Sequence, residues 1–433
     1  MARKMKDSGI EWIGEIPEGW EVAPLKRFTS IQTGNTPSKT SDSNYYASTG
    51  IPWIKPDNLG YSHSISKTSE HLTSEGALCA RIMPPNTVYV CCIGSLGKVG
   101  YSSISCACNQ QINALIFNDL MFWKYGYYLT IAQESQYLLF GNGNVLQIIN
   151  STSQGNIACV LPPLENQHLI ACYLDSVCSD IEVLISKTRS SIEEYKKLKQ
   201  AVITQAVTKG VRGEREMKDS GVEWIGKIPK EWDIIKSSRI IKTTQNGLSR
   251  RDLEKSEGQI ILKLKNITSD GKIDYSFLNR ITLSQNELNT YALTTGDFLF
   301  VRVNGSKSLV GKCAIFEAIS EIVAYNDHII RVKLSNQCYN RFFLWYLYSC
   351  CGKAEIDLHT STAAGQYTIS GDGLRDITLV FPPIDEQKEI ADYLDAKCAE
   401  IDKLIAKKEQ LVKELESYKK SLIYEVVTGK REV

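Results

Sequence analysis

The sequence predicts an α+β protein written twice on one plan: two mixed α/β domains, each followed by a long coiled-coil helix, related by an internal pseudo-two-fold repeat. Three observations predict this. An eighteen-residue phrase starts at Met5 and again at Met217, long amphipathic segments start at Leu161 and Phe381, and the stretches between these repeats share an outline of short apolar strands. A chain of 433 residues is also too long for one ordinary core and fits two to three domains.

The repeated phrase reads "MKDSGIEWIGEIPEGWEV" in the first copy and "MKDSGVEWIGKIPKEWDI" in the second, with 12 of 18 positions identical. Glycines and a proline interrupt it, so it carries neither a helical nor a strand period. Its apolar content is mostly isoleucine with Trp12 and Trp20. We therefore expect an ordered loop pinned by two tryptophans at residues 1–21, and its copy at 214–234. A plain tandem duplication accounts for the phrase taken alone.

The second repeat predicts two long helices. The segments from Leu161 and from Phe381 align without gaps, and each starts with a Pro-Pro pair and a polar first turn. Steps of four and three residues then follow a mostly apolar seam for more than four heptads. We expect coiled-coil helices within 161–213 and 381–433, which pair with each other. The seam residues expected are Ile170, Leu174, Ile181, Leu184, Leu198, Ile390, Leu394, Ile401, Leu404, Leu411 and Leu415.

Between the repeats lie the first variable domain, residues 22–160, and the second variable domain, residues 235–380. Both contain short apolar strands, such as "TVYVCCIG" in the first and "DFLFVRV" in the second. Both continue through an Asn-centred turn, "CNQQINALIF" against "YNDHIIRVKL", to an aromatic helix. The skeleton is therefore shared, whereas the loops differ.

Composition places the protein in a reducing compartment. The first twenty residues lack the apolar run of a signal peptide, and no stretch of 18 apolar residues occurs. The thirteen cysteines show no C-x-x-C spacing for zinc. We expect reduced, mostly buried thiols in a cytoplasmic protein without a membrane partner.

The paired D-S-G-x-E-W-I-G-x-I-P-x-x-W phrase, the P-P-[LI]-x-x-Q-x-x-I-A-x-Y-L-D helix start and the closing "VVTGK" resemble the specificity subunit of type I restriction-modification enzymes. The resemblance covers essentially the whole chain. It implies two target-recognition domains separated by two long antiparallel helices, each domain reading one half of a split site in double-stranded DNA. It also implies two adenine methyltransferase subunits as partners and, in the full complex, two ATP-driven restriction subunits.

The residues themselves encode no catalytic constellation. Adenine methylation needs Asn or Asp before Pro-Pro-aromatic, and the Pro-Pro pairs here follow Met83, Leu161 and Phe381. The glycine-rich stretches at Gly94 and Gly305 lack the spacing of a phosphate-binding Walker loop and read as turns between strands. We therefore expect no cofactor in this chain. The resemblance places S-adenosylmethionine, ATP and Mg²⁺ on the partner subunits.

Charge gives modest support for DNA binding. The chain nets only +1, but the first variable domain holds 8 Lys and Arg against 6 Asp and Glu, and the second 18 against 14. Polar loops beside the strands supply donors for base edges and phosphates. The candidate DNA-binding residues are Thr36, Ser38, Lys39, Lys55, Asn58, Ser95, Lys98, Asn144, Gln147, Ser249, Arg250, Arg251, Lys263, Lys265, Asn266, Arg302, Asn304, Lys307 and Gln366. An ordinary solvated turn is the alternative for each residue singly.

Two other functions remain open at this point. A stand-alone coiled-coil scaffold or DNA-binding regulator would share the helices and loops, but it would not need two equivalent docking surfaces. A single-chain restriction enzyme would need the catalytic motifs that the sequence lacks. Co-purification with a methyltransferase would discriminate among them.

Overall fold

A computed structural model of the chain describes residues 3–37, 44–60, 64–65, 68–141, 147–250, 257–268, 270–363 and 365–433. The chain divides into two compact halves. The first half comprises residues 1–190 and 408–433, and the second half residues 191–407. Because the boundary falls inside the long helices, each half contains one variable domain and a segment of both helices.

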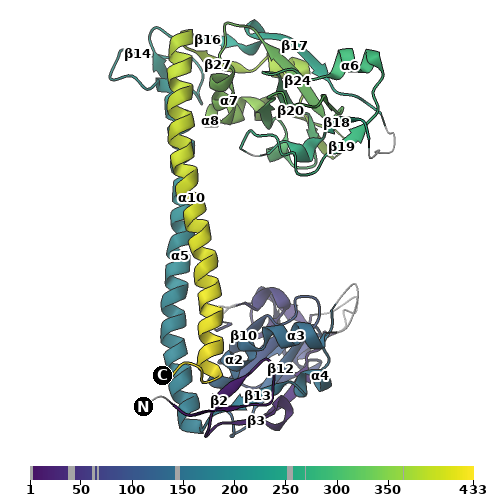
Figure 1. The fold of residues 1–433 in the computed structure, drawn as a ribbon, viewed down its shortest axis with the longest axis vertical. Coiled ribbons are helices and arrows are strands. Elements are labelled where there is room, and N and C mark those ends of the chain that lie inside the picture. Colours follow the sequence, from purple (N-terminus) through teal and green to yellow (C-terminus); the bar gives the residue numbers. More distant parts are fainter. Residues whose placement is uncertain are drawn as a thin grey trace. The chain divides into compact units, whose positions relative to one another are not determined.

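The first variable domain is built on a four-stranded antiparallel sheet (Figure 1). Its strand order is β10 (Val99–Ser102), β9 (Thr87–Cys91), β12 (Ile112–Phe117) and β4 (Thr29–Thr33). A second sheet has the order β5 (Tyr46–Ala47), β7 (His71–Leu72), β6 (Ile51–Ile54), β11 (Cys106–Cys108) and β8 (Ile82–Met83), with β6 and β11 parallel. The helices are α1 (Ser74–Leu78), α2 (Trp123–Ala132), α3 (Glu134–Phe140) and α4 (Ser151–Gly155).

The second variable domain repeats this topology. Its four-stranded sheet has the order β17 (Ile241–Asn246), β24 (Ile329–Leu334), β20 (Phe298–Val301) and β22 (Cys313–Ile315). The second sheet is β19 (Asn279–Ile281), β18 (Gln259–Leu262) and β23 (Val323–Tyr325), with β18 and β23 parallel. The third is β21 (Val303–Asn304), β26 (Gln366–Thr368) and β25 (Ser361–Ala363). The helices are α6 (Gln285–Tyr291), α7 (Asn340–Tyr348), α8 (Cys350–Leu358) and α9 (Gly371–Arg375).

The repeated phrase folds as a small hairpin and is therefore more regular than the loop that the sequence predicts. The strands are β1 (Met5–Asp7) with β2 (Glu15–Pro17), and β14 (Met217–Asp219) with β15 (Lys227–Pro229). Trp20 and Trp232 are buried, whereas Trp12 is half-buried and Trp224 is exposed. A two-stranded ribbon then closes each variable domain: β3 (Glu21–Pro24) with β13 (Ala158–Leu161), and β16 (Asp233–Lys236) with β27 (Thr378–Phe381).

The glutamine in each helix start connects a long helix to its variable domain. The helices are α5 (Leu164–Lys209) and α10 (Ile384–Val427). In α5, Gln167 accepts a hydrogen bond from the backbone N–H of Phe122 and donates to the carbonyl of Pro162. Gln387 does the same with Tyr339 and Pro382. Both glutamines are almost fully buried, so this position of the motif satisfies backbone groups that would otherwise be orphaned.

An aspartate two turns further along each helix holds the aromatic helix of the domain. Asp175 of α5 accepts from Tyr128 at 2.8 Å and pairs with Lys124 of α2. In the second half, Asp395 of α10 accepts from the indole N–H of Trp345 at 2.8 Å and pairs with Arg341 of α7. The contact is thus repeated with different side chains.

The two helices run antiparallel within each half, because rising numbers in α5 meet falling numbers in α10. In the first half, Glu182 pairs with Lys419 and Arg189 pairs with Glu416. In the second half, Lys199 pairs with Asp402 at 2.7 Å, and Arg212, just after α5, pairs with Glu389 at 2.8 Å. The pairs Glu182–Lys419 and Lys199–Asp402 are the same pair exchanged by the repeat. Among the described residues, no helix is both long and apolar enough to cross a membrane.

The buried stripe differs from the predicted heptad seam. Ile170, Leu174, Ile181, Ile390, Leu394 and Ile401 are buried, and Leu404 and Leu415 are half-buried. Leu184, Leu198 and Leu411, which heptad stepping placed on the seam, are instead about half exposed. The stripe takes consecutive steps of four through the buried Cys178 and Cys398, so the order of the later steps of three and four is reversed. Ile181 and Ile401 therefore stay on the stripe, whereas every second later position moves by one residue, as from Leu184 to the buried Ile185.

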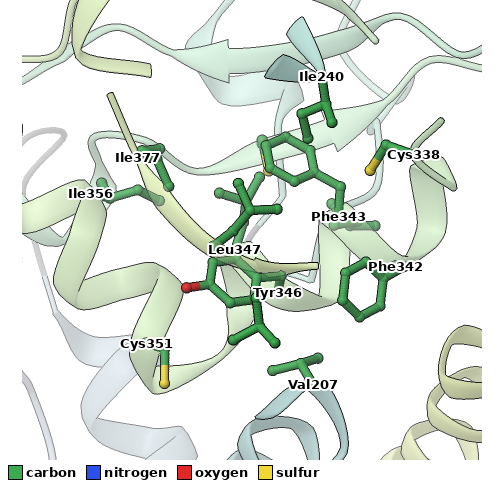
Figure 2. Packing of buried hydrophobic residues seen from close by; sticks show 14 of the residues in the cluster. Val207, Ile240, Cys338, Phe342, Phe343, Tyr346, Leu347, Cys351, Ile356 and Ile377 are labelled. Atoms are coloured by element: carbon green, nitrogen blue, oxygen red, sulfur yellow. The ribbon is translucent and has the colours of Figure 1, made fainter. Parts of the chain in front are cut away.

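Figure 2 shows how the second half is packed. Phe342, Phe343, Tyr346 and Leu347 of α7 lie between Val207 of α5 and Ile377, which precedes β27. These side chains are at most 3 % exposed. Burying a Phe or Leu side chain contributes about 1.5–3 kcal/mol to the stability of the folded state. The packing of this helix therefore holds the variable domain against the long helices.

Candidate nucleic-acid interface

Loops from separate parts of the first variable domain meet at one end of its sheets. The backbone N–H of Asn35, after β4, donates to Cys108 O at 3.0 Å, and that of Asn109 donates to Ile54 O at 3.0 Å. Cys92, after β9, donates to Gln111 O at 2.8 Å. The turn at residues 109–111 is therefore the hub that joins the loops after β4, β6 and β9.

The second variable domain builds the same hub. Leu248 N donates to Tyr325 O at 2.9 Å, and Asn326 N donates to Leu262 O at 3.0 Å. Arg302 N donates to His328 O at 2.8 Å. The turn at residues 326–328 thus takes the place of 109–111, and the predicted loops again converge on it.

Each hub requires a glycine at the point of closest approach. A Cβ on Gly34 would lie 2.2 Å from Cys108 O, and a Cβ on Gly247 would lie 2.1 Å from Asn326 O. Real Cβ atoms do not come this close to a backbone oxygen, so any side chain here would separate the loop from the hub. The backbone contacts of the hub turn therefore hold the loops in a defined arrangement.

A Lys-x-x-Asn turn follows the parallel strand in both domains. The side chain of Asn58 accepts a hydrogen bond from the backbone of Lys55 at 2.8 Å, and Asn266 accepts from Lys263 at 2.9 Å. The Asn266 amide also donates to two carbonyls, and the residue is only 2 % exposed. In this structure the two asparagines shape the turn, and the two lysines stand at its start.

The domain pattern identifies the family. The sequence model described as the type I restriction modification DNA specificity domain matches residues 17–194 and 229–414, which is most of the chain. The chain belongs to this specificity family. The two matched stretches coincide with the two copies of the repeat, so each variable domain is a target-recognition domain of the family.

Relatives and solved structures agree with this assignment. The chain is 25 % identical over 404 residues to the type I restriction enzyme EcoKI specificity subunit of Escherichia coli K12, covering 87 % of this chain and 82 % of that one. It is 24 % identical over 432 residues to the StySPI specificity subunit of Salmonella potsdam, covering 96 % and 90 %.

The fold is similar to that of a solved chain from a study of complex assembly and conformational transition in the type I R-M system, with TM-score 0.73, 14 % identity and coverage of 96 % and 99 %. It is also similar to the HsdS subunit of Thermoanaerobacter tengcongensis, with TM-score 0.51, 14 % identity and coverage of 96 % and 98 %.

Several candidate residues are exposed on the loop clusters of the target-recognition domains. Lys98 and Lys307 lie in the turns after β9 and β21, and Gln366 lies on β26 opposite β25. Lys307 forms a long ion pair with Asp357, at 3.9 Å. Ser95, Gln147 and Ser249 are exposed as well. Apart from Lys307, these side chains can reach a ligand without breaking an internal contact given by the structure.

Other candidates already have partners within the chain. Lys55 pairs with Glu70 at 2.7 Å, and Arg250 pairs with Glu287 at 2.9 Å. Hydrogen bonds from the Ser284 backbone and from Arg250 lower the pKa of Glu287 to about 2, so it is ionised at neutral pH. The remaining contacts are Thr36 with Gln110, Arg302 with Asp327 O, Asn304 with Ser306 N, and Lys265 over the ring of Phe277.

Four candidates, Ser38, Lys39, Asn144 and Arg251, lie outside the described residues. Conversely, sequence reasoning missed the side chains of the hub turns. Gln110 and His328 are exposed beside the candidate loops. The available signal was that both "CNQQ" and "YNDH" place polar residues directly after a buried strand, although the aligned asparagines suggested a purely structural turn.

Proposed function

We propose that this chain reads a bipartite, asymmetric site in double-stranded DNA, with one loop cluster on each half-site. The single observation that carries the proposal is that one framework is present twice with different exposed side chains. The first cluster presents Lys98 and Gln110, whereas the second presents Lys307 and His328. Two copies of one scaffold with different donors recognise two different sequences.

Charge and geometry support the DNA as ligand. The exposed lysines can approach phosphates, and the amide and imidazole groups beside them can approach base edges. Lys55 and Arg250 form ion pairs with Glu70 and Glu287, and a DNA phosphate can replace either carboxylate as the partner. The modest positive excess means that partner subunits share the phosphate contacts.

We further propose that the chain docks two methyltransferase subunits and, in a full complex, two restriction subunits. The repeated hairpin and helix ends give each half an equivalent surface, as the exchanged pairs Lys199–Asp402 and Glu182–Lys419 illustrate. This chain is the non-catalytic subunit in the proposal. The partners supply S-adenosylmethionine-dependent adenine-N6 methylation, and ATP and Mg²⁺ serve the restriction subunits.

The test combines activity with modularity. The purified chain with S-adenosylmethionine should not methylate DNA, and addition of a cognate methyltransferase subunit should give adenine methylation at one defined split site. Replacing residues 235–380 by the second domain of another family member should then change one half of the methylated site only. Methylation by the chain alone, or a change in both halves in sequenced methylomes, would contradict the proposal. A chain that binds its DNA site tightly without any partner would favour the stand-alone regulator.

A further inference from the structure

The repeated hairpin of the second half closes on a buried carboxylate. Glu386, in the first turn of α10, has a side chain only 5 % exposed. It accepts hydrogen bonds from the indole N–H of Trp232 at 3.1 Å and from Arg215 at 2.9 Å, and Arg212 adds a third at 3.2 Å. The Arg215 guanidinium also lies 4.8 Å from the centre of the Trp232 ring. An arginine stacked on a tryptophan therefore forms a receptor for one carboxylate.

The first half keeps these two donors and lacks the acid. Arg3 and Trp20 stand where Arg215 and Trp232 stand in the repeat, and the Arg3 guanidinium lies 5.0 Å from the Trp20 ring. The position of Glu386 is taken by Asn166, which is neutral and one methylene shorter. Trp20 is 2 % exposed, and its indole nitrogen has no hydrogen-bond partner among the described residues. A buried donor left unpaired costs about 1–3 kcal/mol, so this N–H lacks an acceptor that its copy possesses.

The surrounding acids are lost as well. Glu216, Glu231 and Glu389 of the second half correspond to Lys4, Gly19 and Leu169 of the first. In the second half, Arg215 pairs with Glu231, and Arg212 pairs with Glu389. The second half thus neutralises its own arginines, whereas the first half has no equivalent carboxylates at these positions.

The empty receptor adjoins a cavity, and two exposed leucines lie within three residues of Asn166 in the sequence. Arg3 lines a cavity of about 570 Å³ together with Met5, Lys430 and the carboxylates Glu15 and Glu432. Within the described part of the chain, Arg3 forms no ion pair with either carboxylate. Leu164 and Leu169, on the first turns of α5, are 48 % and 56 % exposed. Because residues three apart on a helix lie on the same face, Leu169 is on the side of Asn166. A cationic donor and an exposed leucine on the neighbouring helix suit a segment that presents an acid next to an aliphatic residue.

We infer that the first half carries a binding site for an acidic segment of a partner protein, whose Asp or Glu carboxylate is received by Arg3 and the Trp20 indole N–H. The second half shows the same receptor filled by the chain itself, so the site belongs to one end of the repeat only. The inference does not depend on DNA reading, and its failure would leave the proposed function intact.

The direct test uses the intact chain labelled with 5-fluorotryptophan and observed by ¹⁹F NMR. The probe is the capped dipeptide leucyl-glutamate, with capped leucyl-glutamine as the uncharged control, at constant ionic strength. We expect a saturable shift of the Trp20 signal with the glutamate peptide alone. The Trp232 signal, whose receptor already holds Glu386, should not move. Trp20→Phe and Trp232→Phe assign the two signals.

Variants of the receptor complete the test. Asn166→Glu supplies the missing acid within the chain, so it should raise the melting temperature and abolish the peptide shift. Asn166→Ala leaves the receptor open and should retain the shift. Arg3→Ala, at a half-exposed position, should lose the shift without a change in fold. The inference is overturned if Trp20 shows no carboxylate-specific shift, if both peptides shift it equally, or if Asn166→Glu responds like the wild type.

Discussion

The side-chain oxygen of Gln387 lies 2.8 Å from the backbone nitrogen of Tyr339, and the amide nitrogen of the same side chain lies 2.8 Å from Pro382 O. One buried side chain thus connects the start of α10 to the start of α7. Gln387→Ala should destabilise the second half by about 1–3 kcal/mol, because it leaves a buried donor and acceptor unpaired. Urea unfolding monitored by tryptophan fluorescence measures this. Lys388→Ala, at the neighbouring exposed position, is the control and should change little.

The ion pair between Arg250 and Glu287 should restrain DNA binding. Glu287→Gln removes the charge that holds Arg250 and should tighten DNA binding several-fold in the assembled methyltransferase, with a steeper salt dependence. Fluorescence anisotropy across a salt series measures both effects. Glu321→Gln removes the same charge from the pair with Arg280 and serves as the control. An equal gain in both variants would show a general charge effect and contradict a specific role for Arg250.

The cluster around Glu386 should be a main stabilising element of the second half. Glu386→Asn, which copies the residue at position 166, leaves Arg215 and the Trp232 indole without their acceptor. We expect a loss of about 3 kcal/mol in the free energy of unfolding, at the lower end of the cost of breaking a buried ion pair because Arg212 is half exposed. Glu389→Asn, at an exposed site, should change the free energy of unfolding far less, because water screens its pair with Arg212. Similar losses for both variants in calorimetry would show that burial of Glu386 is unimportant.

Cysteine reactivity should follow burial. Burial raises the pKa of the Cys92 and Cys338 thiols to about 12, so neither forms a thiolate at neutral pH. Of the thirteen cysteines, all of them free, only Cys79, Cys172 and Cys350 are exposed. Brief treatment of the native chain with iodoacetamide should therefore add three groups by intact mass, and treatment in denaturant should add thirteen. Fast native labelling at Cys92 or Cys338 would show that the sheets open.

The fold class could be predicted from periodicity and repeats because both show which faces of a helix or strand are buried. That pattern extends over whole stretches of sequence and does not depend on single residues. The aromatic helix and the Pro-Pro-x-x-x-Gln helix start are examples, since their partners recur in both copies. The seam beyond Cys178 was mispredicted because a cysteine can fill a core position as well as valine does, and the heptad rule gave no reason to prefer it to Val177. Every second later position, including Leu184 and Leu198, was then predicted one residue too early, whereas Ile181 was predicted correctly.

The sequence predicted which loops carry the candidate DNA-binding residues, but it could not predict which single residues are available to a ligand. Whether a polar residue is available to a ligand depends on contacts between distant parts of the chain, such as Asn266 with Phe277 O or Arg250 with Glu287. Sequence spacing does not encode these contacts. The hub turns at Asn109 and Asn326 were recognised as shared, but their role in joining the loops depends on backbone hydrogen bonds that carry no side-chain signature.

The composition of the first half also has a consequence for the order of events during translation. Tyr125 donates a hydrogen bond to Val427 O at 3.1 Å, and Tyr424 donates to Trp12 O at 2.9 Å, so the first half is completed by residues that are synthesised after the second half. The second half, in contrast, is one continuous stretch. On the ribosome, at about 5–20 residues per second, the later half can therefore reach its final state first. The earlier half must wait, exposed to chaperones and proteases, until the segment around Val427 has left the ribosome.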